Sequence, residues 1–122
     1  MLCISLSLFG MTACSDGGAN SYEQITPEQA KTIMDTESEY IIIDARTDEE
    51  FAEGHIADAI LIPEYEIADS AEKALPDKEA LILVYCRSGR RSKIASEELV
   101  KLGYTNVKEF GGIIDWPYEI VK

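Results

Sequence analysis

Cys86 is the residue of this chain best suited to covalent chemistry, because a dense group of cations follows it at once. Four of the eleven Lys and Arg residues fall within the next seven positions: Arg87, Arg90, Arg91 and Lys93. Positive charge beside a cysteine favours the thiolate, which is the nucleophilic form of the side chain. The composition of this segment therefore predicts a cysteine nucleophile.

The segment around Cys86 is predicted to lie between a buried strand and a helix. The apolar run 80–85 ends at Cys86 and is typical of a strand in a parallel sheet, whereas 92–102 carries an apolar stripe at helical spacing. The turn between them contains Gly89, and Gly103 closes the helix. Unpaired N–H groups and the dipole at the helix start would point at the sulfur, favour the thiolate and suit a bound oxyanion.

The rest of the chain alternates between predicted strands and helices. Further strands are predicted at 40–43, 59–62 and 107–110, and helices at 26–34, 47–51 and 64–75. This interleaving predicts an α/β fold with a parallel sheet and helices on both faces. Ligands of such sheets bind at the carboxyl edge, where Asp44 and Arg46 would either support the Cys86 turn or serve the fold alone.

The first thirteen residues carry no charge and form an apolar run that is too short to span a bilayer, which is typical of a signal peptide. The segment 11–14 resembles a bacterial lipobox, so we expect cleavage before Cys14 and lipidation of that cysteine. No Lys or Arg precedes the apolar run, and this absence suggests a start codon upstream of Met1. Residues 14–21 would form a flexible tether and 22–122 the folded domain.

This reading of the N-terminus predicts an extracytoplasmic protein that its lipid holds at a bacterial membrane. A disordered cytoplasmic N-terminus is the alternative. If Cys3 is removed with the signal peptide and Cys14 carries the lipid, Cys86 is the single free thiol of the mature chain. In a compartment where disulfides are common, such a thiol is either buried and inert or kept for chemistry.

Composition limits the size and the partners of the protein. A chain of 122 residues with 46% hydrophobic residues suits one compact domain. The formal net charge of -12 argues against a nucleic-acid partner, because contacts to phosphate need a basic surface.

Three groups of residues, in this order along the chain, together resemble a single-domain rhodanese, which is a sulfurtransferase. They are Asp44-Ala45-Arg46 with Glu50-Phe51 and Gly54-His55-Ile56, then Tyr85 to Ser92, then Gly111-Gly112-Ile113 with Asp115-Trp116. Ala57-Asp58-Ala59 departs from the family, which commonly has Pro-Gly-Ala there. The resemblance implies a rhodanese-like α/β fold with a central parallel sheet of about five strands.

The resemblance also implies a reaction. Cys86 would take a sulfane sulfur from a small anionic donor such as thiosulfate, hold it as a persulfide, and pass it to a thiol or cyanide-like acceptor. Arg87 and Arg91 would steady the donor, and the N–H groups of 88–90 would hold the persulfide. The anion-binding residues would be Arg87, Ser88, Gly89, Arg90, Arg91 and Ser92. No metal or organic cofactor is needed, and a monomer is expected.

Two other functions share some of these residues. A non-catalytic module with the rhodanese fold would sense sulfur or redox state, or dock a partner. A phosphatase of the Cys-x5-Arg type needs an arginine six positions after the cysteine, where this chain has Ser92, and Arg91 is one position short. His55, the only histidine, and Trp116 are expected to have structural roles.

Overall fold

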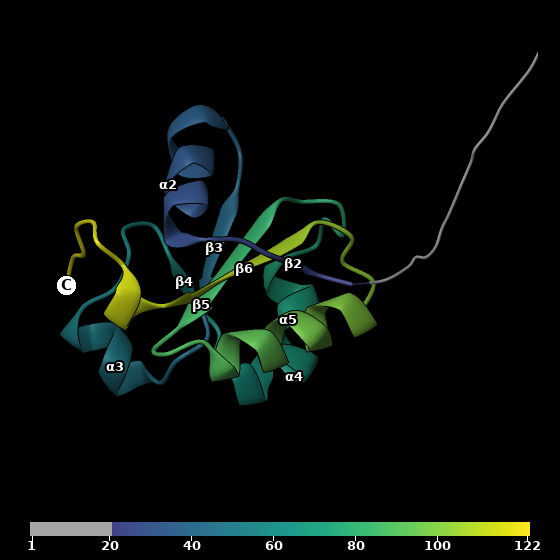
Figure 1. Cartoon of the computed structure of the whole chain (residues 1–122). Helices are drawn as coiled ribbons and strands as arrows, with labels where there is room; N and C mark the ends of the chain where they lie inside the picture. The colour runs from purple at the N-terminus through teal and green to yellow at the C-terminus, as the bar shows by residue number, and fades with distance from the viewer. Residues whose placement is uncertain (1–20) are drawn as a thin grey trace, which may run out of the picture.

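A five-stranded parallel sheet forms the centre of the molecule, with strand order β2-β6-β5-β3-β4 (Figure 1). The computed structural model describes residues 21–122. The strands are β2 Glu23–Gln24, β3 Ile41–Asp44, β4 Ile60–Leu61, β5 Ile82–Cys86 and β6 Val107–Gly112. The predicted parallel α/β fold is confirmed. The predicted signal peptide 1–13, the lipidation site Cys14 and the tether up to residue 20 lie outside the described residues.

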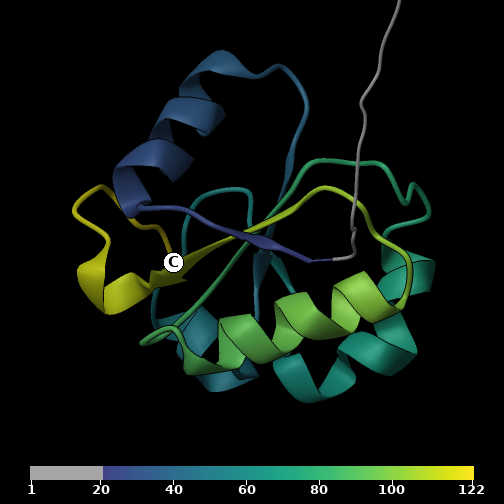
Figure 2. The same cartoon turned by 45° about the vertical axis from the view of Figure 1, so that its right-hand side comes forward.

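Helices cover both faces of the sheet, as predicted (Figure 2). They are α2 Pro27–Thr36, α3 Asp48–Glu53, α4 Ile67–Ala74 and α5 Arg90–Lys101, with the short 3-10 helices η2 Glu64–Glu66 and η3 Ile113–Asp115. The helices α4 and α5 pack against one face, and α2 packs against the other. Within residues 21–122, no helix has both the length and the hydrophobicity that crossing a membrane requires.

The central strand β5 contributes side chains to both cores, because successive residues of a strand point to opposite faces. Ile82, Val84 and Cys86 belong to the core beneath α4 and α5. Leu83 and Tyr85 belong to the core beneath α2. Since all five side chains are buried, the strand reads as a continuous apolar run. Cys86 therefore faces the helix that begins just after it.

Capping boxes fix two of the predicted helix starts. Thr26 accepts a hydrogen bond from the N–H of Gln29, whose side chain accepts one from the N–H of Thr26. Thr47 and Glu50 make the same reciprocal pair at the start of α3. The second pair also holds the Glu50 carboxylate in one orientation.

Two details of the fold differ from the sequence prediction. The strand β2 was not predicted, because its two residues are exposed and show no apolar pattern. It exists through pairing with β6, where Glu23 lies opposite Lys108 and Gln24 opposite Glu109. The predicted helix at 64–75 is divided, since the 3-10 helix η2 precedes α4.

Candidate active site

Cys86 lies at the carboxyl end of β5 with its side chain almost fully enclosed. The residue is 1% exposed. Its Sγ accepts a hydrogen bond from the backbone N–H of Gly89 at 3.0 Å, and the thiol donates to Ser92 Oγ at 3.4 Å. The turn between β5 and α5 thus holds the sulfur by two contacts. An N–H group aimed at sulfur stabilises negative charge on it.

Gly89 gives this turn its shape. Its backbone is left-handed, with φ +108°, a conformation that is costly for a residue with a Cβ. Gly89 is also the N-cap of α5, and no side-chain hydrogen bond caps the helix there. The first N–H groups of α5 therefore suit a bound anion, with the helix dipole acting in the same direction.

The turn packs directly against the end of β6. A Cβ on Gly112 would lie 1.9 Å from the carbonyl oxygen of Arg87 and 2.6 Å from the Cα of Ser88. The same carbonyl of Arg87 accepts the N–H of Ile114 at 3.2 Å. A glycine at 112 is therefore required for the close approach of the two backbones.

Arg91 is bound to a carboxylate on another element. Its guanidinium donates to the two carboxylate oxygens of Glu50 on α3, at 2.8 and 3.0 Å. These hydrogen bonds, together with those from Thr47, lower the pKa of Glu50 to about 2, although partial burial opposes the shift. The pairing with Glu50 raises the pKa of Arg91, and a charge on Cys86 adds to the rise. Arg91 thus lies within electrostatic reach of the sulfur.

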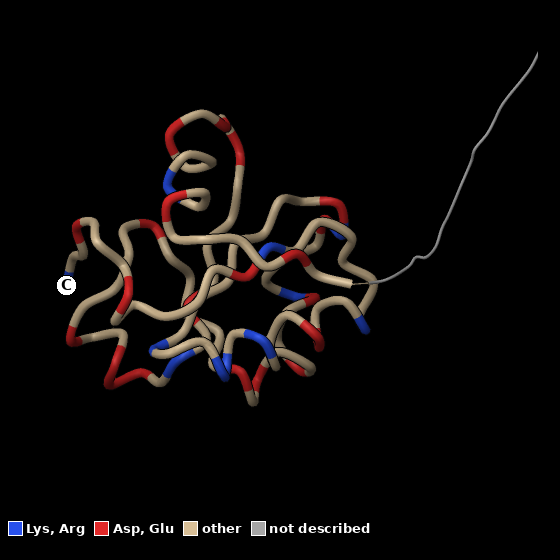
Figure 3. Tube along the Cα trace, in the orientation of Figure 1, with Lys and Arg blue, Asp and Glu red and all other residues tan. Residues whose placement is uncertain are grey.

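Two other arginines of the turn, Arg87 and Arg90, form no ion pair with a carboxylate of the described residues. Both arginines are exposed, as is Ser88. Figure 3 shows basic residues at this turn and the first part of α5, while acidic residues are spread over much of the chain. The edge of the sheet at Cys86 is therefore locally positive on an acidic molecule.

Residues 26–117 match the family model described as a rhodanese-like domain. The chain belongs to the rhodanese-like family.

Related proteins cover most of the same rhodanese-like domain. The chain is 41% identical over 80 residues to thiosulfate sulfurtransferase PspE of Escherichia coli strain K12. The aligned segment covers 66% of this chain and 77% of PspE. It is 32% identical over 96 residues to thiosulfate sulfurtransferase GlpE of Coxiella burnetii, which covers 78% of this chain and 87% of GlpE.

Solved structures have the same fold. A rhodanese with anions from E. coli matches with a TM-score of 0.64 and 38% identity, over 68% of this chain and 98% of that one. A rhodanese-related protein from Thermoplasma volcanium matches with a TM-score of 0.71 and 31% identity, over 82% of this chain and 98% of that one.

In this rhodanese-like domain, the predicted supporting residues Asp44 and Arg46 form a buried pair at the end of β3, beside Tyr85 of β5. Arg46 donates from Nε to Asp44 Oδ1 at 2.9 Å and from Nη2 to Oδ2 at 2.7 Å. The hydroxyl of Tyr85 donates to Asp44 Oδ2 at 2.7 Å. Burial raises the pKa of Tyr85 and the charge of Asp44 adds to the rise, so the hydroxyl remains a donor. The pair thereby anchors the residue next to Cys86.

Ser92 and Glu109 form a second buried contact, beside the sulfur. Ser92 Oγ donates to Glu109 Oε2 at 2.5 Å, and the N–H of Gly111 donates to the same oxygen at 2.9 Å. Sequence reasoning expected Ser92 in the anion-binding loop and missed Glu109. Alternation along β6 could have identified Glu109. It lies two residues after the buried Val107, and a strand places such residues on the same face of the sheet.

His55 and Trp116 have packing roles, as the sequence suggested. The Nδ1 of His55 lies 2.9 Å from the carbonyl oxygen of Phe51, and the two rings stack with centroids 3.7 Å apart. The ring of Trp116 packs against Phe110 with centroids 5.5 Å apart. Both side chains are engaged in the structure of the domain.

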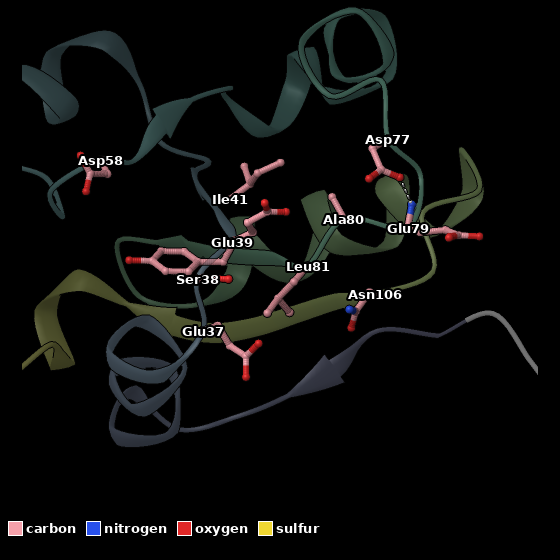
Figure 4. A pocket seen from close by; sticks show the side chains of 11 residues that line it. Glu37, Ser38, Glu39, Ile41, Asp58, Asp77, Glu79, Ala80, Leu81 and Asn106 are labelled. Atoms are coloured by element: carbon pink, nitrogen blue, oxygen red, sulfur yellow. Dashed lines mark hydrogen bonds between the residues drawn. The ribbon is translucent and has the colours of Figure 1, made fainter.

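A separate hollow of about 780 Å³ lies at the opposite, amino-terminal edge of the sheet (Figure 4). Its lining comes from the segments before β3, β4, β5 and β6, and it includes five acidic residues: Glu37, Glu39, Asp58, Asp77 and Glu79. This lining includes no Lys, Arg, His or Cys. Across residues 21–122, no group of three or more His, Cys, Asp or Glu side chains is arranged to hold a metal ion. The Cys86 turn is the better candidate for covalent chemistry.

Proposed function

We propose that this chain is a sulfurtransferase that carries a sulfane sulfur on Cys86 as a persulfide. Membership of the rhodanese-like family and relatives named thiosulfate sulfurtransferase support this class of activity. The observation that carries the proposal is the position of Cys86 Sγ, which accepts the N–H of Gly89 at the start of α5. The same position stabilises a thiolate and a persulfide anion.

The reaction takes place in two displacements. The Cys86 thiolate forms a bond to the outer sulfur of thiosulfate, and the sulfur–sulfur bond of the donor breaks, so sulfite leaves with the electron pair. An acceptor such as cyanide or a thiolate then attacks the outer sulfur of the persulfide. The bond to Cys86 breaks, the acceptor leaves with the sulfur, and the thiolate is regenerated.

Donor binding is assigned to the turn itself. The N–H groups of 88–90 and the exposed cations Arg87 and Arg90 lie where an anion would meet the start of α5. Arg91 contributes positive charge while bonded to Glu50. The sulfur is the covalent intermediate, so the proposed reaction needs no metal or organic cofactor.

A membrane location is proposed from the N-terminal sequence alone. The uncharged segment 1–13 and the lipobox-like residues that end at Cys14 support an extracytoplasmic domain on a lipid anchor. A small sulfur donor and a thiol or cyanide-like acceptor would then be the soluble partners of a monomer.

The proposal is tested by incubating the full chain with thiosulfate and measuring the mass of the peptide 79–87, in which Cys86 is the one cysteine. We expect this peptide to gain one sulfur atom and lose it on addition of cyanide, with thiocyanate formed. Cys86→Ser is the matched control and should show neither change.

If the Cys86 peptide gains no sulfur and turnover equals that of Cys86→Ser, the chain is a non-catalytic module that uses the rhodanese fold for sensing or docking. Release of phosphate from an aryl phosphate by the native chain, but not by Cys86→Ser, would indicate a phosphatase instead.

A further inference from the structure

Glu109 on β6 is a buried carboxylate that the reaction above does not use. The residue is 2% exposed, and within residues 21–122 it takes part in no ion pair. Its hydrogen-bond donors are neutral: the hydroxyl of Ser92 at 2.5 Å, the N–H of Gly111 at 2.9 Å and the amide of Gln24 at 3.5 Å. These neutral hydrogen bonds are therefore what stabilises a charge on this buried carboxylate.

Ser92 links this carboxylate to the nucleophile. The Cys86 thiol donates to Ser92 Oγ at 3.4 Å, and Ser92 donates to Glu109 Oε2 at 2.5 Å. The carbonyl oxygens of Gly89 and Gly111 also lie near Ser92 Oγ, at 3.1 and 3.4 Å, but a hydroxyl has one proton and its contact with Glu109 is the shortest of the three. While Ser92 donates to an ionised Glu109, its oxygen can accept the thiol proton but cannot donate to the sulfur.

A second arrangement of the same atoms reverses both hydrogen bonds, so that Glu109 donates to Ser92 and Ser92 donates to Cys86. The S–H bond of Cys86 breaks and its proton passes to Ser92 Oγ, while the original hydroxyl proton passes to Glu109 Oε2. The sulfur is then a thiolate that accepts from Ser92, and Glu109 is a neutral acid that donates to Ser92. No electron is gained or lost, and no proton enters or leaves the site.

We propose that Cys86, Ser92 and Glu109 share one proton, and that Glu109 is a positioning residue that sets the thiolate fraction of Cys86 through Ser92. The proposal rests on the proposed function only in taking Cys86 as the nucleophile. Because the two arrangements hold equal numbers of protons, their ratio does not depend on pH. The thiolate fraction should therefore be constant across the pH range in which the pair holds one proton.

Other charged groups face this pair from neighbouring elements. Arg91 of α5 lies within electrostatic reach of Cys86 and of Asp44 on β3. Burial raises the pKa of Tyr22, and the charges of Glu97 on α5 and of Glu109 add to the rise. Each variant below leaves these other groups in place, so a change in the profile reports on the shared proton.

The test is the rate at which iodoacetamide alkylates Cys86 in the full chain as a function of pH, read from the mass of the peptide 79–87. The native profile should rise in two steps separated by a plateau. Glu109→Gln removes the second proton-binding group, so its profile should rise in one step. At the pH of the native plateau, we expect alkylation of Glu109→Gln to be about tenfold faster.

A native profile with a single step would overturn the proposal even if Glu109→Gln did not fold. It would also be overturned if Glu109→Gln alkylated at the native rate, or only at higher pH. Glu98→Gln, which removes a partly buried carboxylate of α5 that pairs with Lys101, makes the same change in net charge and should keep the native profile.

Ser92→Ala tests the link. In that background the Glu109→Gln substitution should change the alkylation rate less than about twofold, because the hydrogen-bonded path is already broken. A full tenfold effect without Ser92 would contradict the role of the hydroxyl. Alkylation needs neither a sulfur donor nor an acceptor, so these outcomes are independent of whether the chain turns over thiosulfate.

Discussion

At the scale of single residues, Arg91 lies beside Cys86 but donates its hydrogen bonds to Glu50. Its charge is therefore partly neutralised before any donor arrives. Arg87 and Arg90 are exposed at the same turn, which makes them the better candidates for meeting an anionic donor. The contact between Arg91 and Glu50 instead joins α3 to the start of α5, and it should contribute mainly to stability.

We predict that Glu50→Gln lowers the free energy of unfolding at pH 7 by about 1–2 kcal/mol. The effect is smaller than the pKa shift alone implies, because the Glu50 side chain is 24% exposed and water screens its charge. The folded state lowers the pKa of Glu50 from 4.5 to about 2, so its stabilising effect is present above pH 4.5 and is lost as the pH falls toward 2. Urea unfolding of both chains should show the difference shrinking over this range.

A difference between the native chain and Glu50→Gln that stayed constant from pH 7 to below the folded pKa would contradict this account. Glu49→Gln, a change at a neighbouring exposed carboxylate of the same helix turn, serves as the control for charge. It should change the unfolding free energy by less than about 0.5 kcal/mol.

At the scale of elements, the site depends on how closely the end of β6 approaches the turn after β5. Gly112 has no side chain, and the carbonyl of Arg87 occupies the space where a Cβ would lie. The same carbonyl accepts the N–H of Ile114, so the turn and the start of η3 are fixed to each other. The β5–α5 turn and the β6–η3 junction therefore form a single unit around Cys86.

We predict that Gly112→Ala lowers sulfur transfer by more than about tenfold, because the turn must move to admit the methyl group and displaces the N–H groups around Cys86. Gly111→Ala is the control, since its Cβ meets nothing within 4 Å and it introduces only the strain of φ +91°. Thiocyanate formation and thermal unfolding of both variants check the prediction. Equal activities would mean that the turn adapts without loss.

Some strands and helices of this fold could be predicted from the sequence, and others could not. The run 80–85 predicted β5 because a strand buried on both faces is apolar throughout, and Thr26 before Pro27 predicted a helix start because capping is local chemistry. The strand β2 was missed because Glu23 and Gln24 become a strand only by pairing with β6. Contacts distant in sequence leave no such local pattern.

At the scale of the whole molecule, the formal net charge is -12, whereas the turn at Cys86 carries a local group of cations. The C-terminal segment returns to the domain, where Val121 pairs with His55 in an antiparallel bridge. The N-terminal segment up to residue 20 precedes the described domain, and its proposed role is to carry the lipid.

We predict that the full chain incorporates a labelled fatty acid when it is produced in bacteria that process lipoproteins, and that Cys14→Ser does not. The reason is that the thioether to the lipid forms on the cysteine that ends the lipobox. Cys3→Ser is the matched control and should be labelled like the native chain. An unlabelled native chain, or a label retained in Cys14→Ser, would contradict the proposed anchor.

The sequence by itself determined the parallel α/β fold, the place of Cys86 at the end of a buried strand, and the positive charge that follows it. These properties follow from the local order of apolar, small and charged residues, which sets strand, turn and helix in succession. Tertiary structure decided the partners of the site: Glu50 for Arg91, Tyr85 for Asp44, and Glu109 for Ser92. Each pair joins residues at least 17 positions apart, so only the packing of the sheet and its helices brings them together.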